Sequence, residues 1–235
     1  MKKRIWELDV LRGVCILGMV LVHLIYDLQT FFSLPFLTNS ELFSLIKQWG
    51  GVLFLLISGI CVTLGSHPVR RGLIVFACGL LCSAVTAGMY VLNMADKSII
   101  IYFGVLHCLG VCMLLWPLLK GLPVWALGLV GLGLTVLGLS GNVFVDFPWL
   151  IPLGLYPRGF ASSDYFPLLP NLGFFLLGSF LGKTLYRKKE TLLPWVNPAN
   201  PVLAFFTLLG KWSLPVYLLH QPVITGLLYL ILYIL

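Results

Sequence analysis

Charged residues are scarce in this chain. Of its 235 residues only 10% are Asp, Glu, Lys or Arg, while 60% are hydrophobic; an ordinary soluble domain carries about a quarter charged residues. A soluble fold cannot hide so much apolar surface, and the apolar residues fall in runs of about 20, the length that spans a bilayer core. The composition excludes a soluble domain and predicts an all-α, polytopic membrane helix bundle.

Acidic residues are the scarcer of the two charged classes, with 8 Asp and Glu against 15 Lys and Arg, which gives a formal net charge of +7. A nucleic-acid-binding protein can have such a balance, but here the basic residues form short clusters between apolar runs and do not line one face. We therefore expect no nucleic-acid partner, and we interpret the clusters as a topology signal.

The six cysteines do not form a disulfide pattern, because all of them lie inside apolar runs, where cysteine behaves as a small hydrophobic residue. Cys78 with Cys82, and Cys108 with Cys112 beside His107, stand one helical turn apart. No carboxylate or further histidine stands at metal-ligand spacing, so no metal site is expected. The first apolar run contains His23 and Asp27 and lacks a small-residue cleavage pattern, so it is not expected to be a cleaved signal.

Apolar stretches bounded by charges, Pro and Gly predict about seven transmembrane helices, which form a single domain over residues 1–235. They lie at roughly 11–31, 41–65, 72–92, 100–118, 123–140, 168–185 and 211–233. A cytoplasmic N-terminus puts most Lys and Arg residues inside and leaves only Lys47, Lys97 and Arg158 outside, so the positive-inside rule favours that orientation. No internal repeat is visible, which counts against an inverted-repeat transporter.

Two irregular stretches separate the later helices. Residues 141–167 are long, aromatic and rich in Pro and Gly, which is typical of a functional outer loop or re-entrant cover. Residues 190–200 precede a short apolar piece that ends at Gly210 and is too short to span a bilayer, and we expect it to lie at the interface.

Ionisable side chains inside apolar helices cost about 2.5–3.5 kcal/mol each on the insertion scale, so each one is a candidate functional group. His23 and Asp27 are four residues apart and share a helix face. The alternative is a satisfied interhelical hydrogen bond. Asp9 and Arg12 lie within one turn near the inner end, where a plain interfacial ion pair is the alternative.

Histidines recur at depth in two later helices. His107 and His220, the latter followed by Gln221, fall in the middle or outer half of the bilayer, so they can converge with His23 in one cavity. A packing role for each is the alternative. Asp164 and Tyr165 precede the sixth span, and Asp164 can simply cap that helix. His67 is expected to be a solvated loop residue.

Four blocks carry a family resemblance: RIWELDVLRGVCILGMVLVHLIYD from Arg4, GVLHCLG from Gly104, DYFPLLPNLGFFLLGSFLGK from Asp164, and LGKWSLPVYLLHQPV ending at Val223. They resemble the catalytic domain of heparan-alpha-glucosaminide N-acetyltransferase and its small bacterial relatives. The resemblance implies a transmembrane acyltransferase. It takes an acyl group, acetyl foremost, from cytosolic acyl-CoA and delivers it to a sugar amine or hydroxyl, or a lipid-linked acceptor, on the far side.

The residues are compatible with this activity. Arg12 and His23 are eleven positions apart, about 17 Å along one helix, which is comparable with the reach of a pantetheine arm. We expect His23 to be the general base, with an acyl carrier as the alternative role, and Asp27 to orient it. The remaining site predictions are His107, His220 and Gln221 for the oxyanion or acceptor; Arg158, Asp164 and Tyr165 on the acceptor side; and Asp9, Arg12, Arg70, Arg71, Lys183 and Arg187 for the CoA phosphates.

Two other functions remain as alternatives. A proton-coupled transporter would use histidines and an aspartate at membrane depth equally well. A membrane scaffold would tolerate Asn at His23 and Asp27 and leaves their clustering unexplained. The expected partners are acyl-CoA, the acceptor and the lipid bilayer, with a homodimer left open, and the expected location is a bacterial cytoplasmic membrane.

Overall fold

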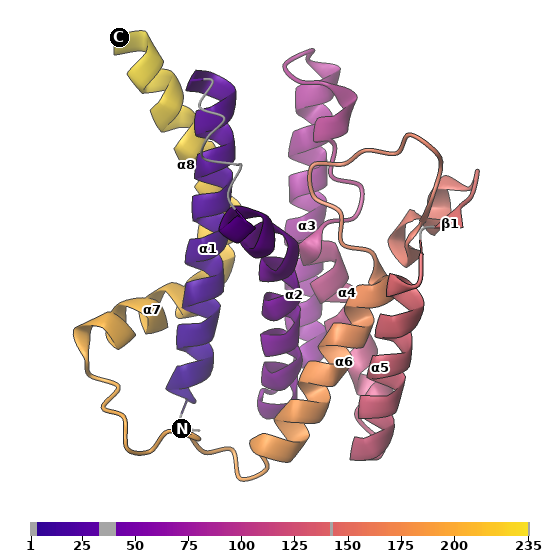
Figure 1. The fold of residues 1–235 in the computed structure, drawn as a ribbon, viewed down its shortest axis with the longest axis vertical. Helices are drawn as coiled ribbons and strands as arrows, with labels where there is room; N and C mark the ends of the chain where they lie inside the picture. The colour runs from indigo at the N-terminus through magenta and orange to yellow at the C-terminus, as the bar shows by residue number, and fades with distance from the viewer. Residues whose placement is uncertain (1–3, 33–40, 142, 235) are drawn as a thin grey trace. The chain divides into compact units, whose positions relative to one another are not determined.

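A computed structural model describes residues 4–32, 41–141 and 143–234 (Figure 1). The chain divides into two compact units: residues 1–54 with 189–235 form unit 1, and residues 55–188 form unit 2. Helices dominate both units, which confirms the predicted all-α class. The prediction of a single domain stays a prediction.

Unit 1 is built on α1 (Trp6–Phe32), which packs against α7 (Pro201–Lys211) and α8 (Ser213–Ile234). It also contains the first part of α2 (Glu41–Leu64). A Cβ on Gly13 would strike the Phe206 carbonyl, and one on Gly210 would strike the Asp9 carbonyl. Because glycine has no side chain, the backbones of α1 and α7 come into contact at Gly13 and Gly210. The helix α7 therefore packs against the first turns of α1.

Unit 2 contains the remainder of α2, α3 (Pro68–Val91), α4 (Val105–Leu119), α5 (Val124–Leu139) and α6 (Leu168–Leu185). In this unit α3 packs on α4, and α6 packs on α5 and α4. Between α3 and α4 lies η2 (Lys97–Ile99). Between α5 and α6 lie β1 (Val143–Phe144), η3 (Pro148–Leu153) and β2 (Leu155–Tyr156), and β1 pairs with β2 in parallel.

Local sequence accounts for several helix starts. Pro68 and Pro201 stand at the first position of α3 and α7, where the missing N–H of proline costs nothing. The Asn200 side chain accepts a hydrogen bond of 3.0 Å from the Val202 N–H and caps α7. Each of the seven predicted spans corresponds to a helix, and the short piece before Gly210 is the 11-residue α7.

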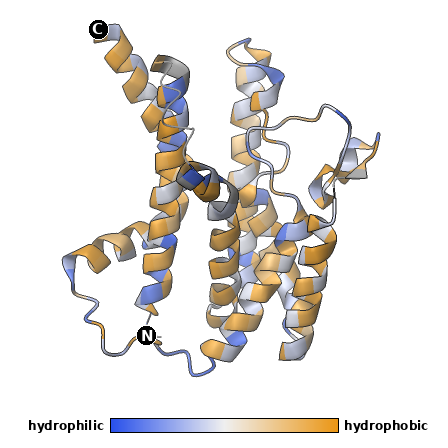
Figure 2. Ribbon diagram, in the orientation of Figure 1, coloured by the Kyte–Doolittle hydropathy of each residue, from blue (hydrophilic) through white to orange (hydrophobic). Residues whose placement is uncertain are grey.

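Four helical segments are long and apolar enough to cross a bilayer, namely Trp6–Gln29, Pro68–Val91, Leu168–Leu185 and Ser213–Ile234. Shorter apolar helices are Trp49–Leu64, Val105–Leu119, Val124–Leu139 and Pro201–Lys211. Figure 2 shows hydrophobic residues along most of each long helix. Large apolar side chains such as Leu73, Leu81 and Val85 on α3 are exposed, as expected for surfaces that face lipid.

The helices of unit 2 alternate in direction, so its charged and aromatic residues collect at opposite ends. At one end the Lys183 ammonium donates to the Lys120 carbonyl at 2.6 Å, which brings the end of α6 to the end of α4. The other end holds η2 and the segment 141–167, with ring contacts among Tyr102, Tyr156 and Phe160. We call these the basic end and the aromatic end.

Candidate functional site

A pair of histidines lies where α1 meets α8 in unit 1. The ring centroids of His23 and His220 are 4.8 Å apart, with the planes tilted by 60°. His23 is half-buried, and the structure gives its ring nitrogens no hydrogen bond to any described residue. The sequence indicated that His23, His107 and His220 can converge in one cavity. The structure brings His23 and His220 together, whereas the hydrogen bonds of His107 are to Ser83 and Gly104.

A carboxylate and an amide lie beside this pair. The Asp27 side chain is 7% exposed, and its Oδ2 accepts a hydrogen bond of 2.8 Å from Gln221 Nε2. Asp27 was predicted to orient His23; among the described residues the hydrogen-bond partner of its carboxylate is Gln221. Since residues 220 and 221 are neighbours on α8, Asp27 fixes the turn that carries His220.

Buried polar atoms remain without partners in this region. The ring Nδ1 of His220 lies 2.6 Å from the Tyr217 carbonyl oxygen, but its Nε2 has no hydrogen-bond partner among the described residues. Gln221 Oε1 and Thr207 Oγ1 are also buried without a hydrogen-bond partner among the described residues. His220 and Gln221 are adjacent on α8. Such atoms cost about 1–3 kcal/mol each when left unpaired, so these two neighbouring atoms indicate a site for a polar ligand.

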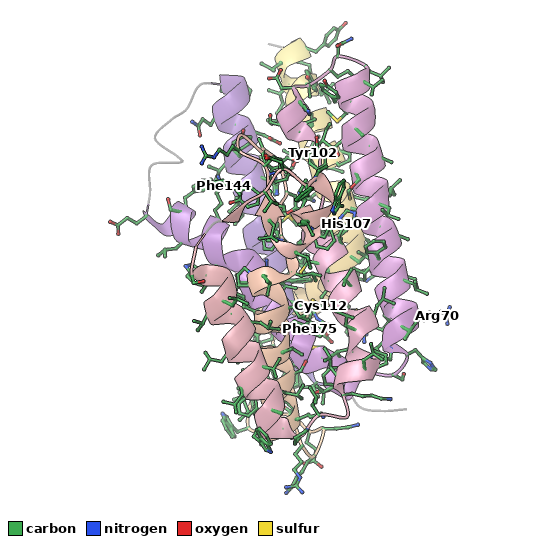
Figure 3. All side chains as sticks on the ribbon, turned by 90° about the vertical axis from the view of Figure 1, so that its right-hand side faces the viewer. Arg70, Tyr102, His107, Cys112, Phe144 and Phe175 are labelled. Carbon is green, nitrogen blue, oxygen red and sulfur yellow. The ribbon has the colours of Figure 1, made fainter. Side chains whose placement is uncertain are left out.

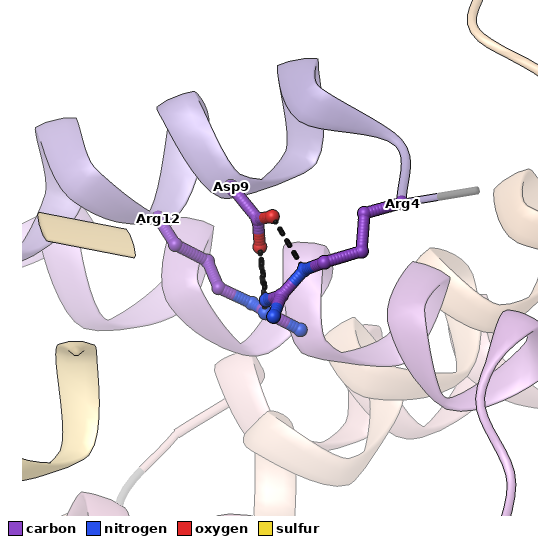
Figure 4. Close-up of polar contacts among 3 residues, drawn as sticks. All are labelled: Arg4, Asp9 and Arg12. Carbon is purple, nitrogen blue, oxygen red and sulfur yellow. Dashed lines mark hydrogen bonds and ion pairs between the residues drawn. The ribbon is translucent and has the colours of Figure 1, made fainter. Parts of the chain in front are cut away.

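A cationic cluster lies at the start of the same helix (Figure 4). Asp9, whose side chain is 5% exposed, accepts two hydrogen bonds of 3.0 Å from Arg4, while Arg12 Nη1 lies at 3.4 Å. Two guanidinium groups and one carboxylate leave a net positive charge. The prediction named Asp9 and Arg12 but missed Arg4, although the cations five residues before and three residues after Asp9 were visible in the sequence.

His107 in unit 2 is held on all sides (Figure 3). It is 3% exposed, its Nδ1 accepts from the Gly104 N–H at 3.2 Å, and its Nε2 lies 3.3 Å from Ser83 Oγ. Ser83 in turn donates to the Ile101 carbonyl at 2.5 Å. Because both ring nitrogens have partners, this histidine ties α3 to the start of α4, which is the packing role considered as the alternative.

Asp164 caps α4. Its Oδ2 accepts a hydrogen bond of 3.0 Å from the Val105 N–H, at the first turn of α4, whereas the alternative to its predicted acceptor-side role was a cap on the sixth span. The chain before α6 runs beside residues 99–105, since the Phe166 N–H donates to the Phe103 carbonyl at 2.9 Å. Asp164 thereby anchors the end of the segment 141–167.

Tyr165 stabilises the same segment by donating from its hydroxyl to the Ile151 carbonyl at 2.8 Å. Burial, and then nearby Tyr156, raises the pKa of the Tyr165 phenol, so the group stays protonated and keeps this bond. The Arg158 guanidinium lies 5.9 Å from the centroid of the Phe144 ring. Ser162 and Ser163 donate to the Ile100 and Ile99 carbonyls at 2.9 and 2.6 Å, so the segment predicted as an outer cover is tied to the residues before α4.

The predicted phosphate-binding cations of unit 2 lie at its basic end. Arg70 and Arg187 are exposed, and Figure 3 shows Arg70 pointing away from α3. Lys183 instead bonds to the Lys120 carbonyl and lies 5.5 Å from the centroid of Trp116. This lysine therefore caps the end of α4, so its charge is already engaged.

No cluster of three or more His, Cys, Asp or Glu side chains that could hold a metal ion is found among the residues the structure describes. The six cysteines are free thiols.

The comparisons with known proteins give one match. The family model described as "Heparan-alpha-glucosaminide N-acetyltransferase, catalytic" matches residues 4–222, which include both histidines of the pair and the cationic cluster. No curated protein and no solved structure matches.

Proposed function

This chain belongs to the family of the heparan-alpha-glucosaminide N-acetyltransferase catalytic domain and is thus a membrane acyltransferase, and we propose that it transfers an acetyl group from acetyl-CoA to an amine or hydroxyl of a sugar. The family match supports an enzyme, and no observation favours a transporter. The proposal extends the family assignment to a donor, an acceptor and named residues.

The observation that carries the proposal is the arrangement of polar groups along α1. The Arg4–Asp9–Arg12 cluster lies at the start of the helix, and His23 follows Arg12 by eleven residues, about 17 Å further along. Guanidinium groups bind phosphates by charge-assisted hydrogen bonds. A CoA thioester whose phosphates lie at the cluster can therefore reach His23 with its carbonyl carbon.

The reaction needs one base and one acid. The acceptor O–H or N–H loses its proton to a ring nitrogen of His23 as its heteroatom bonds to the thioester carbon. The C–S bond then breaks, and the CoA thiolate takes a proton from the protonated ring, which restores the base. Acetyl has moved from sulfur to oxygen or nitrogen, and the balance is one CoA thiol and one acetylated acceptor.

Asp27 acts in this scheme through its bond to Gln221 and as a negative charge that favours the protonated ring of His23. The segment 141–167 covers the acceptor side, with Arg158 toward the acceptor and Asp164 and Tyr165 as its anchors. The protein spans a bacterial cytoplasmic membrane seven times, N-terminus inside, so that acetyl-CoA enters from the cytosol.

The test uses the purified full chain in nanodiscs, with acetyl-CoA as donor and glucosamine as acceptor probe. CoA thiol release and acetylated product are measured together. Replacing His23 by Gln should lower kcat by about 10² to 10⁴, the usual range for a general base, while the Kd for acetyl-CoA stays within about twofold.

The matched control is His67→Asn. This exposed histidine precedes α3 with φ 57°, a conformation that Asn tolerates well. The His67→Asn substitution should leave both kcat and the Kd for acetyl-CoA unchanged. Near-normal turnover of the His23 variant would remove His23 as the base, and absence of product with the unaltered protein would reject the sugar amine as acceptor.

A further inference from the structure

The hydrogen bonds of His220 fix which of its ring nitrogens carries the proton. A carbonyl oxygen can only accept a hydrogen bond, so the short contact from Nδ1 to the Tyr217 carbonyl requires an N–H at Nδ1. A neutral imidazole has one N–H. Nε2 is therefore a bare lone pair, and it is buried without a partner among the described residues.

The same reasoning fixes the amide of Gln221. The NH₂ group of Gln221 donates to Asp27 Oδ2, so it points toward that carboxyl group and Oε1 points elsewhere. Oε1 is also buried and unpaired within the described chain. Adjacent residues of α8 thus present two lone pairs in the neighbourhood of His23, and neither presents a hydrogen to a ligand.

We propose that His220 Nε2 and Gln221 Oε1 bind the acceptor and do not stabilise the oxyanion. An oxyanion hole needs hydrogen-bond donors, and two lone pairs would repel the developing charge. The inference rests on the proposed acetyl transfer for its ligand. It adds that the acceptor is held by its own N–H or O–H groups.

This assignment sets a chemical requirement on the acceptor. One hydrogen of the reacting group goes to His23, and two further donors are needed to satisfy His220 and Gln221. A sugar carries such donors on neighbouring carbons, whereas an isolated hydroxyl has only one. The site therefore selects acceptors with several donors close together, such as an amino alcohol or a diol, because a buried acceptor atom left unpaired costs binding energy.

The tautomer can be tested without any assumption about activity. Histidine labelled with ¹³C and ¹⁵N, in the full chain in nanodiscs near neutral pH, reports the protonated nitrogen of each ring, and the His220→Phe variant assigns the signal. We expect the Nδ1–H form for His220. The Nε2–H form, or a doubly protonated ring, would overturn the proposal, even if acetyl transfer were confirmed.

A kinetic comparison tests the binding role. His220→Phe keeps a ring against His23, and Gln221→Leu removes the second lone pair, so either variant serves if the other fails to fold. Each should raise KM for glucosamine by about tenfold or more with an unchanged Kd for acetyl-CoA. 3-O-methylglucosamine lacks one hydrogen-bond donor, so the unaltered protein should have a higher KM for it than for glucosamine. In at least one of the two variants, this increase in KM should be smaller.

Unchanged KM for glucosamine in both variants would overturn the binding role. A fall in kcat alone would instead assign these residues to stabilisation of the oxyanion, which would also overturn the proposal. Failure of the proposed function looks different. In that case the unaltered protein acetylates neither sugar, while the histidine spectra still show whether Nε2 is a lone pair.

Discussion

His107, which is buried, and His220, which is half-buried, differ in how many of their ring nitrogens have hydrogen-bond partners. Both nitrogens of His107 are paired, to the Gly104 N–H and to Ser83, and its ring also packs on Phe103 with centroids 5.5 Å apart. His220 has one nitrogen paired and one not. Only the second arrangement leaves an atom for a ligand, so burial alone does not identify a functional histidine.

We predict that binding of the acyl donor depends on Arg12. Its side chain is 15% exposed and its contact with Asp9 is the longer one, which leaves N–H groups for a phosphate. Arg12→Gln should weaken acetyl-CoA binding by about tenfold and flatten its dependence on salt, since a charge-assisted bond of about 1.5–3 kcal/mol is lost. Titration calorimetry at two salt concentrations measures both.

Lys97→Gln is the control for this loss of charge. Lys97 begins η2 at the aromatic end of unit 2, away from the expected phosphate cations. It should bind acetyl-CoA as the unaltered protein does. Equal affinities for the Arg12 and Lys97 variants would remove the cluster from the donor site.

At the level of elements, α2 and α6 are joined through glycines. A Cβ on Gly178 would strike the Leu56 carbonyl, and one on Gly59 would strike the Phe175 carbonyl. Ser179 Oγ adds a hydrogen bond of 3.2 Å to the Gly59 carbonyl. Small residues at such crossings let the two backbones approach each other. In a bilayer there is no hydrophobic driving force between helices, so this close van der Waals packing holds them together.

Gly178→Ala should therefore destabilise unit 2 by about 1–3 kcal/mol, the usual cost of overpacking. Gly133→Ala on α5 is the matched change, because no heavy atom lies within 4 Å of its Cβ position. It should be neutral or slightly stabilising, since Ala favours a helix over Gly by about 1 kcal/mol. Thermal unfolding in detergent compares them, and equal melting temperatures would contradict the described packing of α2 on α6.

At the scale of the whole molecule, charge predicts the orientation. The basic end of unit 2 carries the cations Arg70, Arg71, Lys120 and Arg187, while Arg4 precedes α1 and Arg12 lies in its second turn. The positive-inside rule puts such clusters in the cytosol. We therefore predict that the aromatic end faces outward.

Cysteine labelling tests this orientation in intact cells. Ser66→Cys precedes α3, and Asn93→Cys follows it. A maleimide that cannot cross the membrane should label the Asn93 variant and not the Ser66 variant until the cells are permeabilised. The reverse labelling pattern would show that the protein has the opposite orientation in the membrane, with the donor site outside the cell.

Much of this protein could be predicted from the sequence, because apolar periodicity and length are local properties. Seven helices, their approximate bounds and the alignment of Arg12, His23 and Asp27 on one helix follow from spacing alone. The approach of His23 to His220 was also expected, from their similar depth in the bilayer.

Tertiary structure alone decided the hydrogen-bond partners. Asp27 bonds to Gln221 across 194 positions, Asp164 caps α4 across 59, and His107 meets Ser83 across 24. No local pattern carries that information, because a polar side chain bonds to whichever complementary atom the packing of distant elements brings within about 3 Å. For this reason the sequence identified the ionisable groups, whereas the fold determined which lone pairs remain for a substrate.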